Sequence, residues 1–189
     1  MATAPPLQPT LWRTCRVLAN RTRLRIFCLL VHQPNQTVSS VAERLKLPLP
    51  VASQSLRALE ARGLLVVRRV GLRVTYRPSA AAAGGDTQAF VAALRQTLRR
   101  EPPPIEMLYK LSTAFTHPQR IEIFRALQNE PPTLRQLQAA SGISVRALLR
   151  HLKKLKARGF VVCQRGRYKV ATRPDAFARE LARLAAGER

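Results

Sequence analysis

The stretches SVRALLRHLKKLKARG (144–159) and LPVASQSLRALEARG (49–63) share a pattern although few of their letters match. In each, apolar residues recur with the spacing of one helix face: Leu148, Leu152 and Leu155 in one, Ala52, Leu56 and Leu59 in the other. Both end in Ala-Arg-Gly, and glycine is favoured in the left-handed position that follows a helix. Because the offset stays at 96 residues from Thr37 to Gly63, the chain is predicted to contain one folding unit twice.

The elements expected around these two helices also recur in one order. Helices precede them, with expected caps or first residues at Thr10, Asn20 and Ser39 or Ser40 in the first copy and at Pro104 and His117 in the second. A β-hairpin follows, turning at Val70-Gly71-Leu72 and at Arg165-Gly166. Each copy closes with an amphipathic helix, expected at 86–100 and 175–186, so the domains are placed at 1–101 and 102–189.

Basic residues dominate both halves of the chain. Of 189 residues, 33 are Lys or Arg and 10 are Asp or Glu, giving a formal net charge of +23. Residues 1–85 carry +11 and residues 86–189 carry +12, so the charge is not confined to a basic tail. Both copies are therefore expected to meet an acidic polymer, the alternative being solvated charged faces on an arginine-rich chain.

The order helix, helix, helix-turn-helix and hairpin is that of a winged helix-turn-helix. The segments LANRTRLRIF (18–27), LPVASQSLRALEARGLL (49–65) and RRVGLRVTYR (68–77) resemble the ArsR-type winged-helix repressors, and the second copy resembles them more loosely. The resemblance implies a mainly helical α+β fold with small hairpins, two such domains in tandem, and a dimer interface made by first and last helices. One chain carrying both copies is thus expected to form a pseudo-symmetric intrachain dimer, and further homodimerisation through the terminal helices stays open.

Four basic residues lie opposite the leucines on the second copy's helix: Arg146, Arg150, Lys153 and Lys154. Like charges at this spacing repel one another unless an anion lies opposite them. Double-stranded DNA supplies such anions, and arginine can also bridge guanine O6 and N7. Arg146 and Arg150, near the helix start, are expected to contact bases, and the two lysines phosphates; a solvated basic face is the alternative.

The first copy offers a different surface on the equivalent helix. Its polar outward candidates are Ser53, Gln54 and Arg57. Leu49 and Val51 add apolar surface where the family usually shows polar residues, which predicts weak reading through thymine methyl groups and Gln54, or mainly backbone binding. The hairpins add basic candidates for the minor groove or backbone: Arg68, Arg69, Arg73 and Arg77 in the first copy, Arg165, Arg167 and Lys169 in the second.

ANRTRLRIF (19–27) and THPQRIEIF (116–124) place Arg23 and Arg120 in the same frame at a helix start. A helix N-terminus is the positive end of its dipole, so arginine there costs stability, whereas a phosphate is favoured. Either both arginines face the DNA backbone, or they form hydrogen bonds to carbonyls or carboxylates inside their own domain. The sequence leaves both alternatives open.

Other chemistry lacks its usual signals. Family members that sense metals often carry cysteines where this chain has Thr37, Ser39, Thr133 and Arg135. His32, His117 and His151 show no ligand spacing to one another or to cysteine, so no metal and no cofactor is expected. Cys15 and Cys28 lie on apolar stripes and are expected in the core. No nucleophile–base pattern or glycine-rich phosphate loop stands out, so an enzyme is not expected.

The sequence shows no signal peptide and no uncharged apolar stretch of membrane-spanning length, and its three cysteines form no close pair, which together predict a cytoplasmic protein. The leading prediction is a sequence-specific regulator that binds double-stranded DNA, a repressor that does not sense metal. Two alternatives stay open: a non-specific DNA- or RNA-binding or chromosome-architecture protein, and a winged-helix module that docks protein partners.

Overall fold

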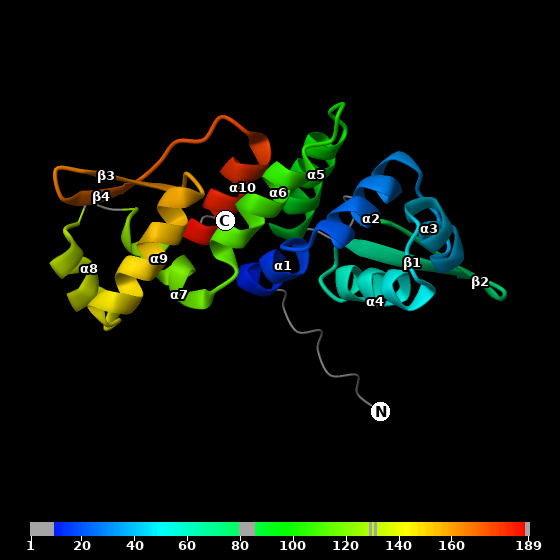
Figure 1. Ribbon diagram of the computed structural model, residues 1–189, viewed down its shortest axis with the longest axis horizontal. Helices are drawn as coiled ribbons and strands as arrows, with labels where there is room; N and C mark the ends of the chain where they lie inside the picture. Colours follow the sequence, from blue (N-terminus) through cyan, green and yellow to red (C-terminus); the bar gives the residue numbers. More distant parts are fainter. Residues whose placement is uncertain (1–9, 80–85, 129, 131, 188–189) are drawn as a thin grey trace.

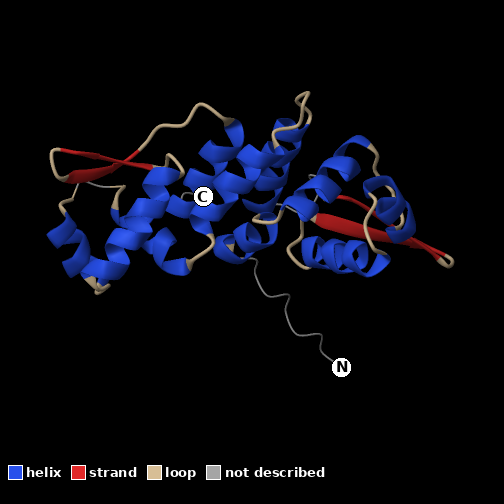
Figure 2. Ribbon diagram, in the orientation of Figure 1, coloured by secondary structure: helices blue, strands red, loops and turns tan. Residues whose placement is uncertain are grey.

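The computed structural model describes residues 10–79, 86–128, 130 and 132–187. In this part of the chain, helices predominate and two short antiparallel hairpins accompany them (Figure 2). The predicted α+β class with two tandem winged helix-turn-helix units is confirmed. Residues 1–9 and 80–85 of the predicted first domain lie outside the described residues.

The first copy consists of four helices, a hairpin and a closing helix. In chain order these are α1 (Leu11–Leu18), α2 (Arg21–His32), α3 (Val38–Leu45), α4 (Leu49–Glu60), β1 (Leu65–Val70), β2 (Arg73–Pro78) and α5 (Asp86–Leu98). The strands pair from Leu65 with Pro78 to Val70 with Arg73, which leaves Gly71 and Leu72 as the predicted turn.

The second copy repeats this order. Its elements are α6 (Ile105–Ser112), the 3-10 turn η1 (Thr113–Phe115), α7 (Pro118–Ala126), α8 (Leu134–Ser141), α9 (Val145–Ala157), β3 (Val161–Gln164), β4 (Arg167–Val170) and α10 (Ala176–Ala186). The hairpin turns at Arg165 and Gly166 as predicted, and both residues have positive φ (49° and 73°). This geometry suits the twist of a two-residue hairpin loop.

Side-chain caps begin six of the described helices, whereas the N-cap residues of α1, α4 and α6 make no such bond. Thr10 is therefore the N-cap residue of α1 as predicted, but its side chain does not cap the helix. Oδ1 of Asn20 accepts the Arg23 N–H (3.0 Å), and Nδ1 of His117 accepts the Gln119 N–H (3.2 Å), so both predicted caps are confirmed. The third helix begins earlier than predicted. Thr37, and neither Ser39 nor Ser40, is its N-cap, because Oγ1 of Thr37 accepts the Ser40 N–H (3.2 Å).

The two copies fill their cores differently. Phe115, Phe124 and Phe160 are fully buried in the second copy, and their rings meet edge to face with centroids 4.8–6.3 Å apart. The first copy has Phe27 at the place of Phe124 and the aliphatic Leu64 at the place of Phe160. Edge-to-face rings add about 0.5–1.5 kcal/mol per pair beyond the area they bury.

A short bridge ties each hairpin to the residue before the third helix. The Tyr76 N–H donates to the Gln36 carbonyl (2.8 Å), and the Tyr168 N–H donates to the Pro132 carbonyl (2.9 Å). The same bond therefore recurs in both copies and holds hairpin and helix-turn-helix in one unit. Sequence reasoning missed it.

The copies contact each other through helices outside the helix-turn-helix segments. Helix α1 packs against α6 and η1, α2 packs against α6, and α5 packs against α10. Phe90 of α5 and Phe177 of α10 lie with ring centroids 5.3 Å apart, and both are buried. Figure 1 shows α1, α5, α6 and α10 at the centre of the molecule, with one helix-turn-helix and its hairpin at each end.

An arginine at the start of α2 also joins the copies. The guanidinium of Arg21 donates to both carboxylate oxygens of Glu106 in α6 (2.8 and 2.9 Å) and lies over the Tyr109 ring, 3.9 Å from its centroid. This pairing lowers the pKa of Glu106, chiefly through the hydrogen bond from Arg21. One of the arginines crowded at this helix start therefore serves the contact between the copies.

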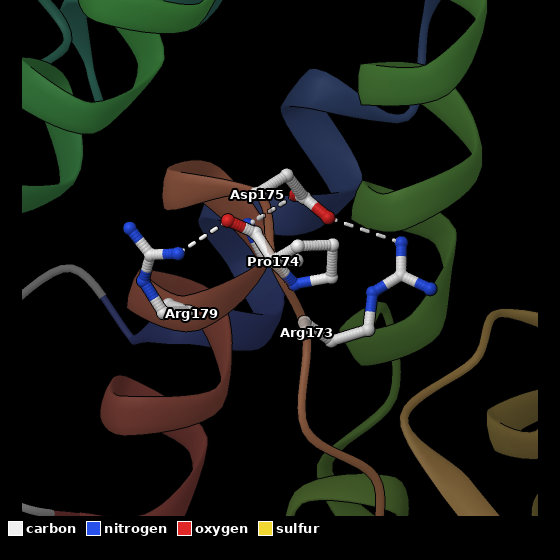
Figure 3. Close-up of polar contacts among 5 residues, drawn as sticks. Arg173, Pro174, Asp175 and Arg179 are labelled. Carbon is white, nitrogen blue, oxygen red and sulfur yellow. Dashed lines mark hydrogen bonds and ion pairs between the residues drawn. The ribbon is translucent and has the colours of Figure 1, made fainter.

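The chain enters α10 through a compact polar turn (Figure 3). Oδ1 of Asp175 accepts the Ala178 N–H (2.8 Å) and so caps the helix, while its other oxygen pairs with Arg173 (3.1 Å). Arg179, one turn into the helix, donates to the Pro174 carbonyl. These contacts fix the start of the helix that packs against α5.

Candidate nucleic-acid interface

The second helix-turn-helix is built by matched caps. Thr133 and Gln136 form a reciprocal capping box at the start of α8. Gly142, with φ of 64°, ends that helix, and Oγ of Ser144 accepts the Ala147 N–H (3.4 Å) to begin α9. The turn between the two helices is therefore short, and it brings α9 to the surface.

Helix α9 has a buried face and a basic face. Leu148, Leu152 and Leu155 are buried as predicted, and Arg146, Arg150 and Lys153 are exposed, as their helical spacing requires. Lys154 is only half-buried, and burial, with Arg158 and Arg120 nearby, lowers its pKa. Helix α9 contains no acidic residue that would neutralise this face. Contact of these side chains with DNA stays a prediction.

His117 and His151 lie close together, although no sequence spacing pairs them. Their ring centroids lie 4.9 Å apart, because His151 points inward from α9 and His117 caps α7. His151 is 2% exposed, and one ring nitrogen contacts Oε1 of Gln119 (3.1 Å). Burial, aided by His117, Arg120 and Arg150, lowers the pKa of His151 to about 4. His151 thus belongs to the packed face of α9.

The hairpin of the second copy extends the basic surface. Arg165 and Arg167 are exposed, and Lys169 is half-buried next to the paired strand. Figure 1 shows this hairpin on the outer end of the molecule, beside α8 and α9. The geometry therefore allows contact with a duplex that α9 touches.

The equivalent helix of the first copy is less charged. Gln54 and Arg57 are exposed, whereas Ser53 is half-buried. Leu49 and Val51 at the helix start are 53% and 39% exposed. The apolar surface expected at this helix start is therefore present, and few polar groups accompany it.

The hairpin of the first copy carries more charge than its helix. Arg68, Arg69, Arg73 and Arg77 are all exposed. Arg68 and Arg69 are neighbours that point to opposite faces of the hairpin, so both can be exposed only because the tip projects beyond the helices. Figure 1 shows this projection at the end of the molecule opposite the second hairpin.

Arg23 and Arg120 take the intramolecular alternative. Arg120 donates to the carbonyls of Ala114 (2.6 Å) and Thr113 (3.4 Å) and to the Thr116 hydroxyl. Arg23 donates to the Val17 carbonyl (3.3 Å). In both copies this arginine thus bonds carbonyls at or just beyond the end of the preceding helix, inside its own domain.

Sequence reasoning missed exposed cations on the first helix of each helix-turn-helix. These are Arg44 on α3, Lys46 just after it, and Arg135 on α8. A helix in this position crosses the DNA backbone in helix-turn-helix complexes, so their place in the motif was the available signal.

The described cysteines and histidines form no metal site. Cys15 and Cys28 are buried as predicted, and burial raises the pKa of both thiols. Within the described residues, no three His, Cys, Asp or Glu side chains gather closely enough to hold a metal ion. None of the described helices has the length and apolar character needed to cross a bilayer.

Comparison with known families gives two matches along this chain. A family model described as a helix-turn-helix domain matches residues 18–68 and again 115–164, just over half of the chain. Each match covers one helix-turn-helix and the first strand of its hairpin. Comparison with curated proteins and with solved structures finds no match. Helix-turn-helix domains generally bind double-stranded DNA, so this chain is a DNA-binding regulator in the general sense. The chain belongs to the helix-turn-helix domain family and carries that domain twice.

Proposed function

We propose that this chain is a sequence-specific transcriptional regulator of the ArsR type, a repressor that does not sense metal and that binds double-stranded DNA with both copies at once. The main support is the face of α9, where Arg146 and Arg150 are exposed on a helix whose opposite side is fully packed. A rigid helix that presents arginine in this way suits the major groove, where guanine offers two acceptors.

We further propose that the two copies act as a pseudo-dimer. The packing of α1 against α6 and of α5 against α10, with Phe90 on Phe177, supports this pairing, since equivalent helices of the two copies meet. A covalent pair loses less entropy on binding than two separate chains, because the second contact is intramolecular. Its half-sites would lie about one helical turn apart, ~34 Å.

The two half-sites are proposed to differ. Arg146 and Arg150 favour guanine, whereas Gln54, Leu49 and Val51 favour adenine or thymine methyl groups. Lys153, Lys154 and the basic hairpins would hold phosphates and contribute affinity that falls with salt. Repression would follow from occupancy, because a bound chain covers both half-sites and excludes other proteins from them.

Selection from a pool of random duplexes with the full chain tests this function. We expect enrichment of one site with two unlike halves, and lower transcription from a reporter that carries this site in its promoter. Affinity without sequence preference that falls steeply with salt would overturn the proposal in favour of an architectural role. If the chain selects such a site but does not lower transcription from the reporter, only the assignment as a repressor is wrong.

A second candidate is a protein-docking role for the first copy. Its support is the apolar surface of that copy, where Leu49 at the start of α4 and Val70 and Leu72 at the hairpin tip are all largely exposed. Failure to bind any duplex at low salt would favour this role.

A further inference from the structure

A cavity of about 330 Å³ lies between the two copies. Helices α1 and α5 line it from the first copy, α7 and α10 line it from the second, and Arg62, just past α4, reaches its edge. The volume falls at the lower end of the range of about 300–1,000 Å³ typical of small-molecule sites. None of the residues proposed to contact DNA lines it.

The walls of the cavity combine an apolar and aromatic side with hydroxyl and charged groups. Phe90 and Ile121 are buried, and Trp12 and Leu184 are half-buried beside them. The guanidinium groups of Arg13 and Arg16 lie over the Trp12 ring, 5.0 and 5.8 Å from its centroid. An apolar ligand body bound here would displace water from these side chains.

The charged groups of the cavity favour an anion. Arg62 and Arg125 line it together with one acid, Glu122. Nε of Arg125 donates to the Ala185 carbonyl (3.1 Å), which fixes this guanidinium at the end of α10. Among the described residues, no hydrogen bond or ion pair engages the side chain of Arg62 or of Glu122. With Arg13 and Arg16 beside Trp12, the guanidinium groups in and around the cavity outnumber its one carboxylate.

We propose that this cavity binds a small organic monoanion, an aromatic or branched apolar body that carries one carboxylate. The apolar side of the cavity takes the body, and Arg62 and Arg125 take the carboxylate, because a guanidinium presents paired donors that match a carboxylate's two oxygens. Both copies contribute to the site, so the ligand binds only the chain in which they are packed together.

Such a ligand would also tune DNA binding, a consequence that rests on the proposed function. The cavity touches α1 and α7, which belong to different copies, and Arg62 follows α4 directly. A ligand that fits one relative placement of the copies better than another shifts that placement, and DNA must then change ligand affinity by the same factor.

The single tryptophan of the chain gives a direct test of the site that needs no DNA. The fluorescence of Trp12 is followed while the full chain is titrated with phenylacetate, phenylacetamide or phenethylamine, three probes of similar shape that differ in charge. We expect saturable binding of phenylacetate, with the amide and the amine roughly ten- to a hundredfold weaker. Equal affinity for all three, or preference for the amine, would overturn the proposal.

Substitution of each lining arginine tests which guanidinium binds the carboxylate of the probe. Arg62→Met and Arg125→Met are each expected to weaken phenylacetate by roughly tenfold or more, whereas Arg99→Met, an exposed residue outside the cavity, should leave its affinity unchanged. Ile121→Phe fills the cavity and should abolish the titration while circular dichroism stays native. If Arg125→Met disturbs folding through the lost bond to Ala185, Arg62→Met alone decides, and unchanged binding there contradicts the proposal.

Failure of the cavity site and failure of the proposed DNA-binding function give different results in these experiments. Phenylacetate binding with no duplex binding under any condition would keep the site and remove the regulator. Duplex selection as expected, with a flat Trp12 titration, would keep the regulator and remove the site.

Discussion

Helices α4 and α9 hold the same place in their copies but present different chemistry to solvent. Each buries an apolar stripe at equivalent positions, Ala52, Leu56 and Leu59 against Leu148, Leu152 and Leu155. Outward, α9 carries arginine and lysine beside exposed Val145 and Leu149, whereas α4 carries exposed Leu49 and Val51 with Arg57 as its one cation. The packed face of a duplicated helix is constrained by its neighbours, whereas the solvent face can change without loss of fold. The shared fold therefore does not determine which bases each copy recognises.

The buried sides of the two copies also differ at single positions. His151 stands where the first copy has Ser55, and Phe160 stands where it has Leu64; all four are buried. The second copy thus holds an aromatic cluster and a buried neutral imidazole that the first copy lacks. The following predictions use these differences, from the largest expected effect to the smallest.

Phe160→Ala is expected to lower the free energy of unfolding by about 3–5 kcal/mol, because it removes edge contacts with Phe115 and Phe124 and leaves a cavity. Leu64→Ala in the first copy should cost less, since no ring contact is lost. Urea denaturation of both variants measures the difference. A loss below 1 kcal/mol for Phe160→Ala would show that the aromatic cluster does not hold the second copy together.

Acidification should destabilise the second copy through His151. Its pKa is lowered from the usual 6.5 to about 4, so the unfolded chain binds more protons between these pH values. This contribution is complete above pH 6.5 and is lost as pH falls toward 4, by on the order of 3 kcal/mol. Burial also lowers the pKa of His117, which adds in the same direction.

His151→Ser installs the residue of the first copy and provides the matched variant. It should reduce the pH dependence of the free energy of unfolding between pH 7 and 4, while costing stability at pH 7 through lost packing. Urea titrations across this range measure both effects. A pH dependence identical to that of the parent chain would assign acid sensitivity elsewhere.

Arg150→Ala is expected to cost about 1–3 kcal/mol of discrimination at one base pair, in one half-site only. Gln54→Ala should affect the other half-site and by less, because α4 offers few polar groups. Binding to the selected site and to its single-base variants measures both. The assigned roles fail if Arg150→Ala weakens every sequence equally.

Lys154→Ala should weaken binding to all duplexes alike and lower the slope of log affinity against log salt by about 0.9. Burial, with Arg158 and Arg120 nearby, lowers the pKa of Lys154. Arg99→Met, at the end of α5, serves as a control of equal charge change. A base preference altered by Lys154→Ala would argue for a base contact instead.

Local features of this chain were predictable because they depend on spacing of a few residues. The i, i+4 pattern predicted which side of α9 is buried, and Arg165-Gly166 predicted the hairpin turn. Candidate cations exposed at the surface, such as Arg146 and Arg150, followed from the same spacing. These predictions needed no knowledge of neighbouring elements.

Contacts between distant residues were not predictable in this way. Arg21 and Glu106 are 85 residues apart, and they meet because α2 packs against α6. His117 approaches His151 only through the packing of α7 against α9. From the sequence alone, Arg120 could equally have faced a DNA phosphate, whereas in the structure it donates to the Ala114 carbonyl. Each of these depends on how helices pack, which periodicity does not encode.

Symmetrised operators test most directly whether two unlike surfaces of one chain share a duplex. The affinity of the full chain is measured for the selected site and for two palindromes, each built from one half-site repeated at the same spacing. We expect the unsymmetrical site to bind tightest, one chain per duplex. A palindrome that binds as tightly as the selected site, with two chains per duplex, would contradict the account.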